Sequence, residues 1–136
     1  MPVFSPLSHG LGRRQVWREL ARGGRLAFLD PSNDLLEQLA LFEPTSITAV
    51  PSFFGLLQRR FERELGTQLD GDRAAAMRTV RLSLGRRLIH VSIGGALVPR
   101  PLLLFLEACL GIGGTGGGNC VVKDGYGTTG GMRERF

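Results

Sequence analysis

The chain has 136 residues, of which 43% are hydrophobic and 21% are charged, a composition typical of one ordinary globular domain. Its net charge is +5, but 16 of the 17 basic residues are arginines spread along the sequence, and aromatic residues make up only 7%. This pattern argues against a nucleic-acid-binding protein, and the arginines form either a solvated basic surface or an anion-binding face. Cys109 and Cys120 lack zinc-ligand spacing and are expected to be reduced thiols.

The sequence shows no sign of secretion or membrane insertion. The first residues lack the apolar core and cleavage site of a signal peptide. The most apolar stretch, RPLLLFLEACLGIGG, contains Glu107 and is too short to span a membrane. We therefore expect a cytoplasmic protein, and peripheral association with a membrane stays open.

Short apolar or β-branched runs, typical of buried strands, alternate along the chain with longer segments whose apolar residues recur at helical spacing. Ser32 or Asn33 is predicted to cap the second helix, Ser52 to open the third, and Pro99 to start the last. The predicted elements are helix 12–24, strand 25–30, helix 34–43, strand 46–51, helix 53–66, helix 71–85, strand 87–95, helix 100–111 and strand 119–127.

This alternation predicts an α/β fold with a mainly parallel sheet and crossover helices. Residues 1–136 are expected to form one domain at most, in which the Gly-rich segment GIGGTGGGN (111–119) is a flexible loop. Ligands of such sheets collect at the carboxyl ends of the strands. Those ends are VP at 50–51, SIGGALVP at 92–99 and DGYGTTGG at 124–131.

Two of these strand ends, and one histidine, have residues suited to binding. In DGYGTTGG the glycines permit close approach to a phosphate, Thr128 and Thr129 add hydroxyl donors, and Tyr126 offers a flat face for a purine; a plain loop is the competing interpretation. In SIGGALVP the glycines let a planar ring lie against bare backbone, although glycine pairs also simply end strands. His9, in PLSHGLG, can bind a carboxylate or phosphate or have a structural role, while His90 is interpreted as a core or surface histidine.

Taken in order, PLSH, EPTSITAVPSFFGLL, SIGGALVP and DGYGTT resemble motifs of the adenylate-forming (AMP-binding) superfamily of acyl- and aryl-CoA synthetases. Within it, the chain looks similar to long-chain fatty acyl-CoA synthetases and to the adenylation domain of carboxylic acid reductases. The resemblance covers residues 5–130 and implies a slice of the large N-terminal domain. It also implies a two-step reaction: a carboxylic (fatty) acid attacks ATP to give an acyl-adenylate, and a thiol of CoA or of a carrier protein then displaces AMP.

The resemblance also implies roles for residues that match the family's motifs. Thr129 would hydrogen-bond the α-phosphate, and His9 would lie near the phosphate and the carboxylate, which makes these two the expected catalytic residues. The acid would contact His9, Phe53, Phe54 and Gly95. The nucleotide, ATP or AMP, would contact Gly94, Gly95, Ala96, Asp124, Gly125, Tyr126 and Thr129.

The sequence departs from the family at points that matter for catalysis. The family's glutamate that helps hold Mg²⁺ is replaced by Gly130, which has no side-chain oxygen. The 136 residues also contain neither the phosphate loop with its lysine nor the catalytic lysine of the C-terminal domain. We therefore expect no activity from this chain alone. The alternative is a non-catalytic nucleotide- or acyl-binding module that associates with a partner through exposed apolar faces.

Overall fold

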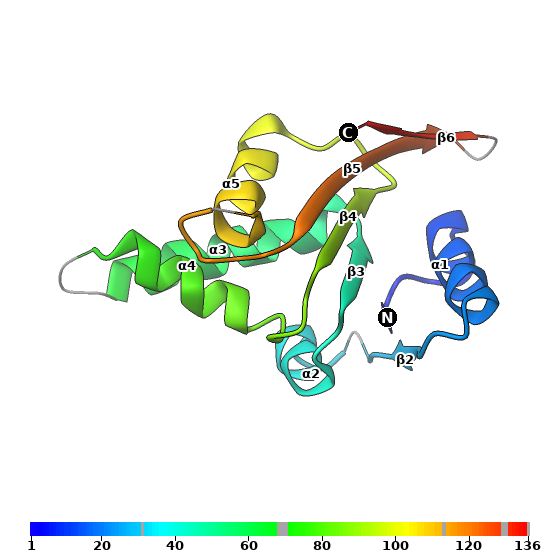
Figure 1. Cartoon of the computed structure of the whole chain (residues 1–136), viewed down its shortest axis with the longest axis horizontal. Helices are drawn as coiled ribbons and strands as arrows, with labels where there is room; N and C mark the ends of the chain where they lie inside the picture. The colour runs from blue at the N-terminus through cyan, green and yellow to red at the C-terminus, as the bar shows by residue number, and fades with distance from the viewer. Residues whose placement is uncertain (31, 68–70, 113, 129–130, 136) are drawn as a thin grey trace.

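The computed structural model describes residues 1–30, 32–67, 71–112, 114–128 and 131–135, with only the backbone described for 126–128 and 131–135. In this part of the chain, helices α3, α4 and α5 lie on one side of a four-stranded sheet and α1 lies on the other (Figure 1). The elements are β1 (Pro2–Val3), α1 (Gly10–Ala21), β2 (Ala27–Phe28), α2 (Leu35–Phe42), β3 (Ser46–Ala49), α3 (Pro51–Thr67), α4 (Arg73–Leu82), β4 (His90–Gly94), α5 (Arg100–Leu110), β5 (Val121–Thr128) and β6 (Gly131–Arg135).

The main sheet has the strand order β3-β4-β5-β6. Strands β3, β4 and β5 are parallel neighbours, connected through helices, while β6 folds back antiparallel to β5. A separate parallel pair joins β1 to β2 near α1. The predicted α/β class with a mainly parallel sheet is thus confirmed.

The register of the sheet gives it two unlike faces. Ile47 pairs with Val91, and the next residues along, Thr48 and Ser92, pair with each other. Because side chains alternate between the faces of a strand, the apolar residues share one face and the hydroxyl residues share the other. Ile47 is completely buried on its face, which the helices α3–α5 cover.

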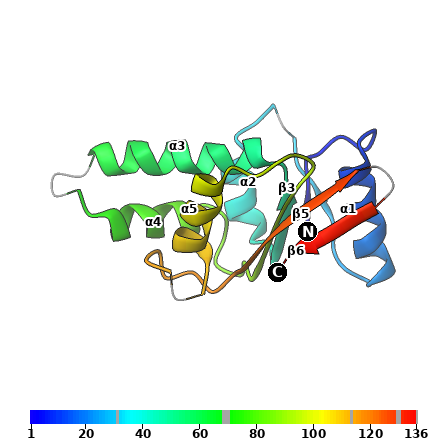
Figure 2. The ribbon, with the colours of Figure 1, turned by 90° about the horizontal axis from the view of Figure 1, so that it is seen from above.

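The core lies between that apolar face and the three helices. Phe54 and Leu57 of α3 are completely buried there. Aromatic contacts join the helices to one another: the rings of Phe61 and Phe105 are 5.3 Å apart, and the guanidinium of Arg73 lies 5.0 Å from the centre of the Phe61 ring. Figure 2 shows the resulting body, in which α3 and α4 run side by side and extend beyond the sheet.

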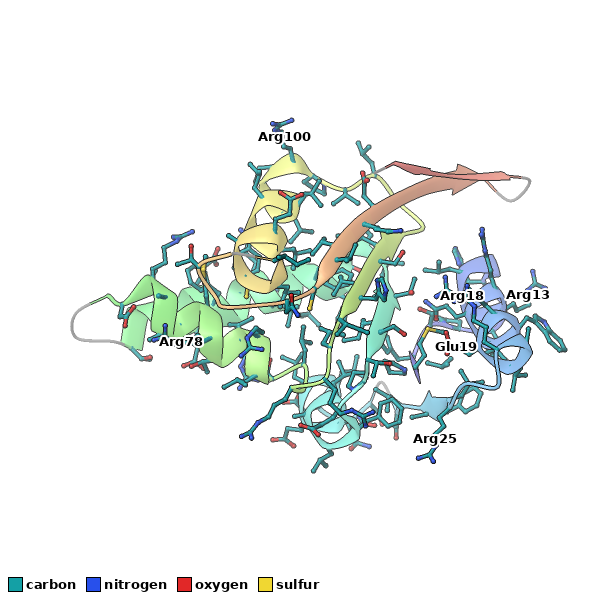
Figure 3. All side chains as sticks on the ribbon, viewed as in Figure 1. Arg13, Arg18, Glu19, Arg25, Arg78 and Arg100 are labelled. Atoms are coloured by element: carbon teal, nitrogen blue, oxygen red, sulfur yellow. The ribbon has the colours of Figure 1, made fainter. Side chains whose placement is uncertain are left out.

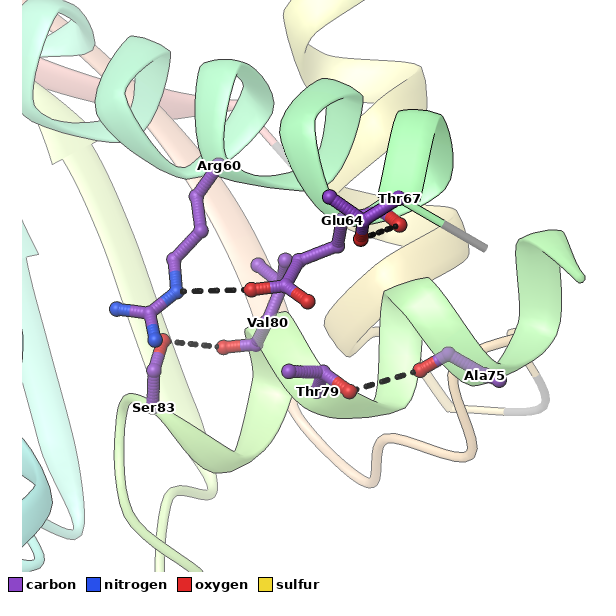
Figure 4. Close-up of polar contacts among 7 residues, drawn as sticks. All are labelled: Arg60, Glu64, Thr67, Ala75, Thr79, Val80 and Ser83. Atoms are coloured by element: carbon purple, nitrogen blue, oxygen red, sulfur yellow. Dashed lines mark hydrogen bonds and ion pairs between the residues drawn. The ribbon is translucent and has the colours of Figure 1, made fainter. Parts of the chain in front are cut away.

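Polar contacts at the solvent-facing ends of α3 and α4 are local (Figure 4). Arg60 and Glu64 form an ion pair one helical turn apart, with 3.9 Å between Nε and Oε1. The hydroxyl groups of Thr67, Thr79 and Ser83 each donate to a backbone carbonyl three or four residues earlier, at 2.8, 3.2 and 2.6 Å. These contacts lie within single helices or at their ends, whereas the apolar core and the contact of Arg73 with Phe61 join α3 to α4.

Described residues of the Gly-rich segment after α5, where the sequence predicts a flexible insertion at 111–119, lie close to that helix. The backbone N–H groups of Gly116 and Cys120 donate to the carbonyls of Ala108 and Leu110, at 3.0 and 2.9 Å. A Cβ atom at Gly118 would lie only 2.1 Å from the carbonyl oxygen of Leu110. The glycines therefore permit a tight cap on the end of α5, because any side chain at these positions would collide with the helix backbone.

Other expectations also change in detail. The cap of α2 is Asp34, whose side chain accepts from Leu36 N at 2.9 Å, and not Ser32 or Asn33. Those two residues instead donate to the carboxylate of Asp30, and the hydrogen bonds from Ser32 lower the pKa of that carboxyl. Helix α3 begins at Pro51, one residue before the predicted Ser52.

Strands β1 and β6, near the two ends of the chain, were not predicted from the sequence. β1 has only two residues, too few to produce a period-two pattern, and the predicted strand 25–30 is reduced to β2, Ala27–Phe28. Strand β6 begins at Gly131, the last residue of the predicted Gly-rich turn, and continues to Arg135, where no element was predicted. It pairs antiparallel with β5, the strand directly before it in the chain, from Thr128 with Gly131 to Asp124 with Arg135.

Candidate functional site

A cavity of about 590 Å³ opens where β3 leads into α3. This is the carboxyl end of a parallel strand, the position where ligands of α/β sheets bind. Its polar members include Ser8, His9, Ser52 and Arg59. The apolar residues that line it are Phe4, Pro6, Leu11, Leu35, Val50, Phe53 and Leu56.

His9 is the N-cap residue of α1 and lines this cavity. Its backbone is extended, with φ −88° and ψ 139°, and its Nδ1 accepts a hydrogen bond from Leu11 N at 3.3 Å. A neutral imidazole that accepts at Nδ1 carries its proton on Nε2. The cap thus orients the ring and makes Nε2 a hydrogen-bond donor suited to a carboxylate or phosphate oxygen.

Gly95 lies beside His9 although the two are far apart in sequence. A Cβ atom at Gly95 would be 3.8 Å from Cε1 of His9 and 3.3 Å from Cγ1 of Val50. The residue also has a φ of +86°, which favours glycine. The structure therefore brings together two residues that the sequence singled out, and it keeps bare backbone next to the imidazole.

The other residues predicted to contact the nucleotide lie at the adjacent ends of β4 and β5. Gly94 and Gly125 are buried and pair with each other in the parallel register. Asp124 is half-buried and pairs with Ile93, while Ala96 is exposed just beyond β4. At this edge of the sheet, the paired glycines of β4 and β5 therefore leave the backbone of both strands uncovered by side chains.

The structure describes only the backbone of Tyr126 and does not describe Thr129, the two remaining residues that were predicted to contact the nucleotide. The backbone of Tyr126 pairs with Arg133 in the β5–β6 hairpin, but its side chain lies outside the described part of the chain. Thr129 and Gly130 lie wholly outside it. The roles of Tyr126 and Thr129 therefore stay predictions from the resemblance.

The two predicted acid-contacting phenylalanines have different surroundings. Phe53 lines the cavity, and its ring centre is 4.8 Å from that of Phe4. Phe54 is completely buried in the core, with its ring 5.2 Å from that of Phe53. Consecutive helical residues point about 100° apart, so only one of the two can face the cavity. The structure brings Phe53 to His9 and leaves Phe54 in the core.

Sequence reasoning missed Arg59, which is exposed and lines the 590 Å³ cavity together with a neighbouring cavity of about 700 Å³. One of its guanidinium nitrogens would lie 3.8 Å from a Cβ placed on Gly55. The side chain is therefore folded back one turn along α3. Its spacing of seven residues from Ser52, two helical turns, is the signal that could have identified it.

Neither cysteine is suited to act as a nucleophile. Burial raises the pKa of the Cys109 thiol to about 11 and also raises the pKa of Cys120. Their sulfur atoms donate to the carbonyls of Met77 and Leu88, at 3.4 and 3.1 Å. Both thiols are neutral, inert members of the core.

A test for a metal site gives no fit for Mg²⁺. Among the described residues, no group of three or more His, Cys, Asp or Glu side chains lies together. Gly130 offers no side-chain oxygen at the position where the family has a glutamate. Within the same described residues, no helix has both the length and the apolar character needed to cross a bilayer.

The fold and site are those of an α/β domain with a ligand cavity at the carboxyl ends of its parallel strands. The chain matches the family of AMP-binding enzymes over residues 1–131, and it belongs to that family. It is 32% identical to the carboxylic acid reductase of Mycobacterium tuberculosis and 30% identical to that of Mycobacterium marinum. Each match covers 93% of this chain but only 11% of the relative, so the chain spans about a tenth of those proteins.

Solved structures agree with this assignment. The adenylation domain of the carboxylate reductase from Mycobacterium chelonae superimposes with a TM-score of 0.78 at 23% identity, over 94% of this chain and 20% of that one, and so supports the fold. The didomain of the carboxylic acid reductase from Segniliparus rugosus, solved in complex with AMP, gives 0.78 at 26% identity over 95% of this chain and 18% of that one. The resemblance to the adenylate-forming superfamily is thus confirmed, and the relatives named above are carboxylic acid reductases.

Proposed function

We propose that these residues form the acid-binding side of an acyl-adenylate site, together with the part of the nucleotide pocket made by β4 and β5. The overall reaction would join a carboxylic acid to ATP, giving an acyl-adenylate and pyrophosphate. A thiol would then displace AMP, and a carrier-protein thiol is favoured over CoA because the similar didomain from Segniliparus rugosus includes a carrier domain.

One observation carries the proposal: the imidazole of His9 lies beside the bare backbone of Gly95, and His9 lines an apolar cavity of about 590 Å³. In such a site the polar head of a ligand meets the histidine while its apolar body lies against Leu11, Val50 and Phe53. A carboxylic acid with an aromatic or aliphatic body has this chemistry.

The residues of the chain would contribute orientation and charge stabilisation. Nε2 of His9 would donate to a carboxylate or phosphate oxygen, and its cap hydrogen bond to Leu11 N would hold the ring in place. The paired ends of β4 and β5 at Gly94 and Gly125 would let a planar adenine approach the backbone. Formation of an acyl-adenylate needs positioning and charge neutralisation more than a protein nucleophile.

A second function, binding without turnover, is favoured by Gly130. A chain that keeps the backbone pocket but lacks the oxygen ligand of the family at this position is expected to bind AMP more readily than to process ATP. Exposed apolar side chains fit a role within a larger assembly: Trp17 is 70% and Leu97 81% exposed.

Calorimetry with AMP and pyrophosphate-release assays on the 136-residue chain distinguish these functions. We expect AMP binding in the millimolar range, lost in Tyr126→Ala, and no acid-dependent release of pyrophosphate from ATP with a panel of fatty and aromatic acids. Acid-dependent release above background would establish turnover and refute the inactive module. Absence of AMP binding at millimolar ligand would refute both nucleotide-binding functions for this chain.

A further inference from the structure

A second cavity, of about 430 Å³, lies between α1 and the sheet, away from the acyl-adenylate site. Its floor is the face of the sheet that the helices α3–α5 do not cover, and one wall is α1. The polar and charged residues that line it are Thr45, Ser46, Thr48, His90, Ser92 and Lys123 from the strands and the residues before them, and Arg18, Glu19 and Arg22 from α1 and its C-cap. Ile47, Ile89 and Val91 line it as well.

The polar floor is unusual for a parallel sheet. Such sheets are normally covered on both faces, so their strands are apolar on both sides. Here the register places Thr48 next to Ser92, and Ser92 next to Lys123, in one row across three strands. Polar groups between two elements require hydrogen-bonding partners, so this face is built for a polar occupant and not for an apolar helix.

The charges around the cavity are mainly positive. Arg18, Arg22 and Lys123 line it, and Glu19 is its one acidic residue. The Glu19 carboxylate is turned toward the end of α1, since a Cβ placed on Gly24 would lie 2.5 Å from its Oε2. Figure 3 shows Arg18 and Glu19 on the side of α1 nearer the sheet, and Arg78 and Arg100 on the far side of the molecule.

Arg18 has donor capacity left for a ligand. Its Nε is buried and has no hydrogen-bond partner in the described part of the chain. Its Nη2 lies 3.9 Å from the sulfur of Met1, which is a weak acceptor. Arg18 also lines the cavity, so an oxyanion bound there would place acceptor oxygens beside its guanidinium group.

We propose that this cavity is a binding site for a phosphate group, either free as phosphate or pyrophosphate or carried by a larger molecule. A phosphate offers several acceptor oxygens in different directions, and the residues that line the cavity include two arginines, one lysine and four residues with hydroxyl groups. The site is separate from the cavity at His9, and the proposal does not depend on the proposed function.

Calorimetric titration of the 136-residue chain with pyrophosphate at constant ionic strength tests the proposal. We expect saturable binding that weakens about tenfold in Arg18→Gln and about threefold or more in the exposed Arg22→Gln, as charge-assisted hydrogen bonds are lost. Arg13→Gln, on the same helix but outside the cavity lining, and Arg100→Gln, on α5, should bind as the wild type does. Circular dichroism of each variant verifies folding, and Arg22→Gln keeps the test valid if Arg18→Gln unfolds.

The source of the phosphate is resolved by competition. If AMP displaces pyrophosphate from the wild type, the site accepts the phosphate of a nucleotide; if it does not, the ligand is a free oxyanion. Absence of pyrophosphate binding at millimolar concentration overturns the proposal. Equal weakening in Arg13→Gln and Arg22→Gln also overturns it, because that result would show unspecific attraction to a basic surface.

Discussion

Alternate residues of the same strands form the two faces of the sheet, yet one face packs against helices and the other lines a polar cavity. One face, with Ile47, Val91 and Ile93, is at most 1% exposed and packs under α3, α4 and α5. The opposite face, with Thr48, Ser92 and Lys123, lines a polar cavity under α1. The comparison teaches that the stability of this fold resides on one side of the sheet, which leaves the other side and the strand ends free to bind ligands.

The sharpest test of that difference uses neighbouring residues of β4. Ile93 is completely buried, so Ile93→Ala should lower the free energy of unfolding by about 2–5 kcal/mol through lost burial and a residual cavity. Urea denaturation of the variant and the wild type measures the change. A loss below about 1 kcal/mol would contradict the assignment of this face to the core.

The Gly-rich loop after α5 also contributes to stability, because it packs closely against the end of that helix. Gly118→Ala would place a Cβ 2.1 Å from the Leu110 carbonyl, and we expect a loss of about 3 kcal/mol because backbone has to move. The control is Gly66→Ala, in α3, where a Cβ meets nothing within 4 Å. That variant should gain about 0.5–1 kcal/mol from helix propensity. Equal effects of the two substitutions on the melting temperature would mean that the loop is a free linker.

The buried thiol of Cys109, on the same side of the sheet, makes the free energy of unfolding depend on pH. Burial raises the pKa of Cys109 from 9.0 to about 11, so the folded state keeps the proton that the unfolded state releases. This contribution is fully present below about pH 9 and is lost as the pH rises toward 11, by roughly 2 kcal/mol. Denaturation series at pH 8, 9 and 10.5 should show that decline, reduced in Cys109→Ala. A stability that rises over this interval would contradict the burial of the thiol.

The smallest effect is expected on the polar face. Ser92 is only partly buried and packs outside the apolar core, so Ser92→Ala should change the free energy of unfolding by no more than about 0.5 kcal/mol. The same urea series used for Ile93→Ala provides the measurement. A loss comparable to that of Ile93→Ala would show that both faces stabilise the fold equally.

Much of the fold could be predicted because its signals are local. Helical spacing of apolar residues in 53–66 and β-branched runs such as 46–51 led to the α/β class, and the order of PLSH, SIGGALVP and DGYGTT led to the family. The pairing of β1 with β2 joins residues about 25 positions apart, and no local pattern encodes it. The pairing of β6 with β5 is local, but the Gly-rich residues between them were interpreted as a turn without a second strand.

The site could be predicted in part for the same reason. His9 and Gly95 stood out by their motifs, but only the fold shows that they meet. Phe53 and Phe54 are the same residue type at neighbouring positions, so the sequence alone does not distinguish them. The packing of α3 determines that Phe53 faces the cavity and Phe54 faces the core. The close contacts of Gly116 and Gly118 with α5 could not be predicted, because glycine-rich composition is equally typical of a flexible linker and of close backbone contact.

The central claim is that His9, Gly95 and the strand ends form an acyl-adenylate site, and one binding measurement tests it directly. The ligand is a non-hydrolysable acyl-adenylate analogue with an aromatic acyl group, titrated calorimetrically into the wild type, Gly95→Ala and the control Gly66→Ala. We predict binding to the wild type and the control, and at least a tenfold loss in Gly95→Ala, whose Cβ would lie 3.8 Å from His9 and occupy the ligand's place against the backbone. Equal affinity of all three proteins, or no binding to any of them, would contradict the account.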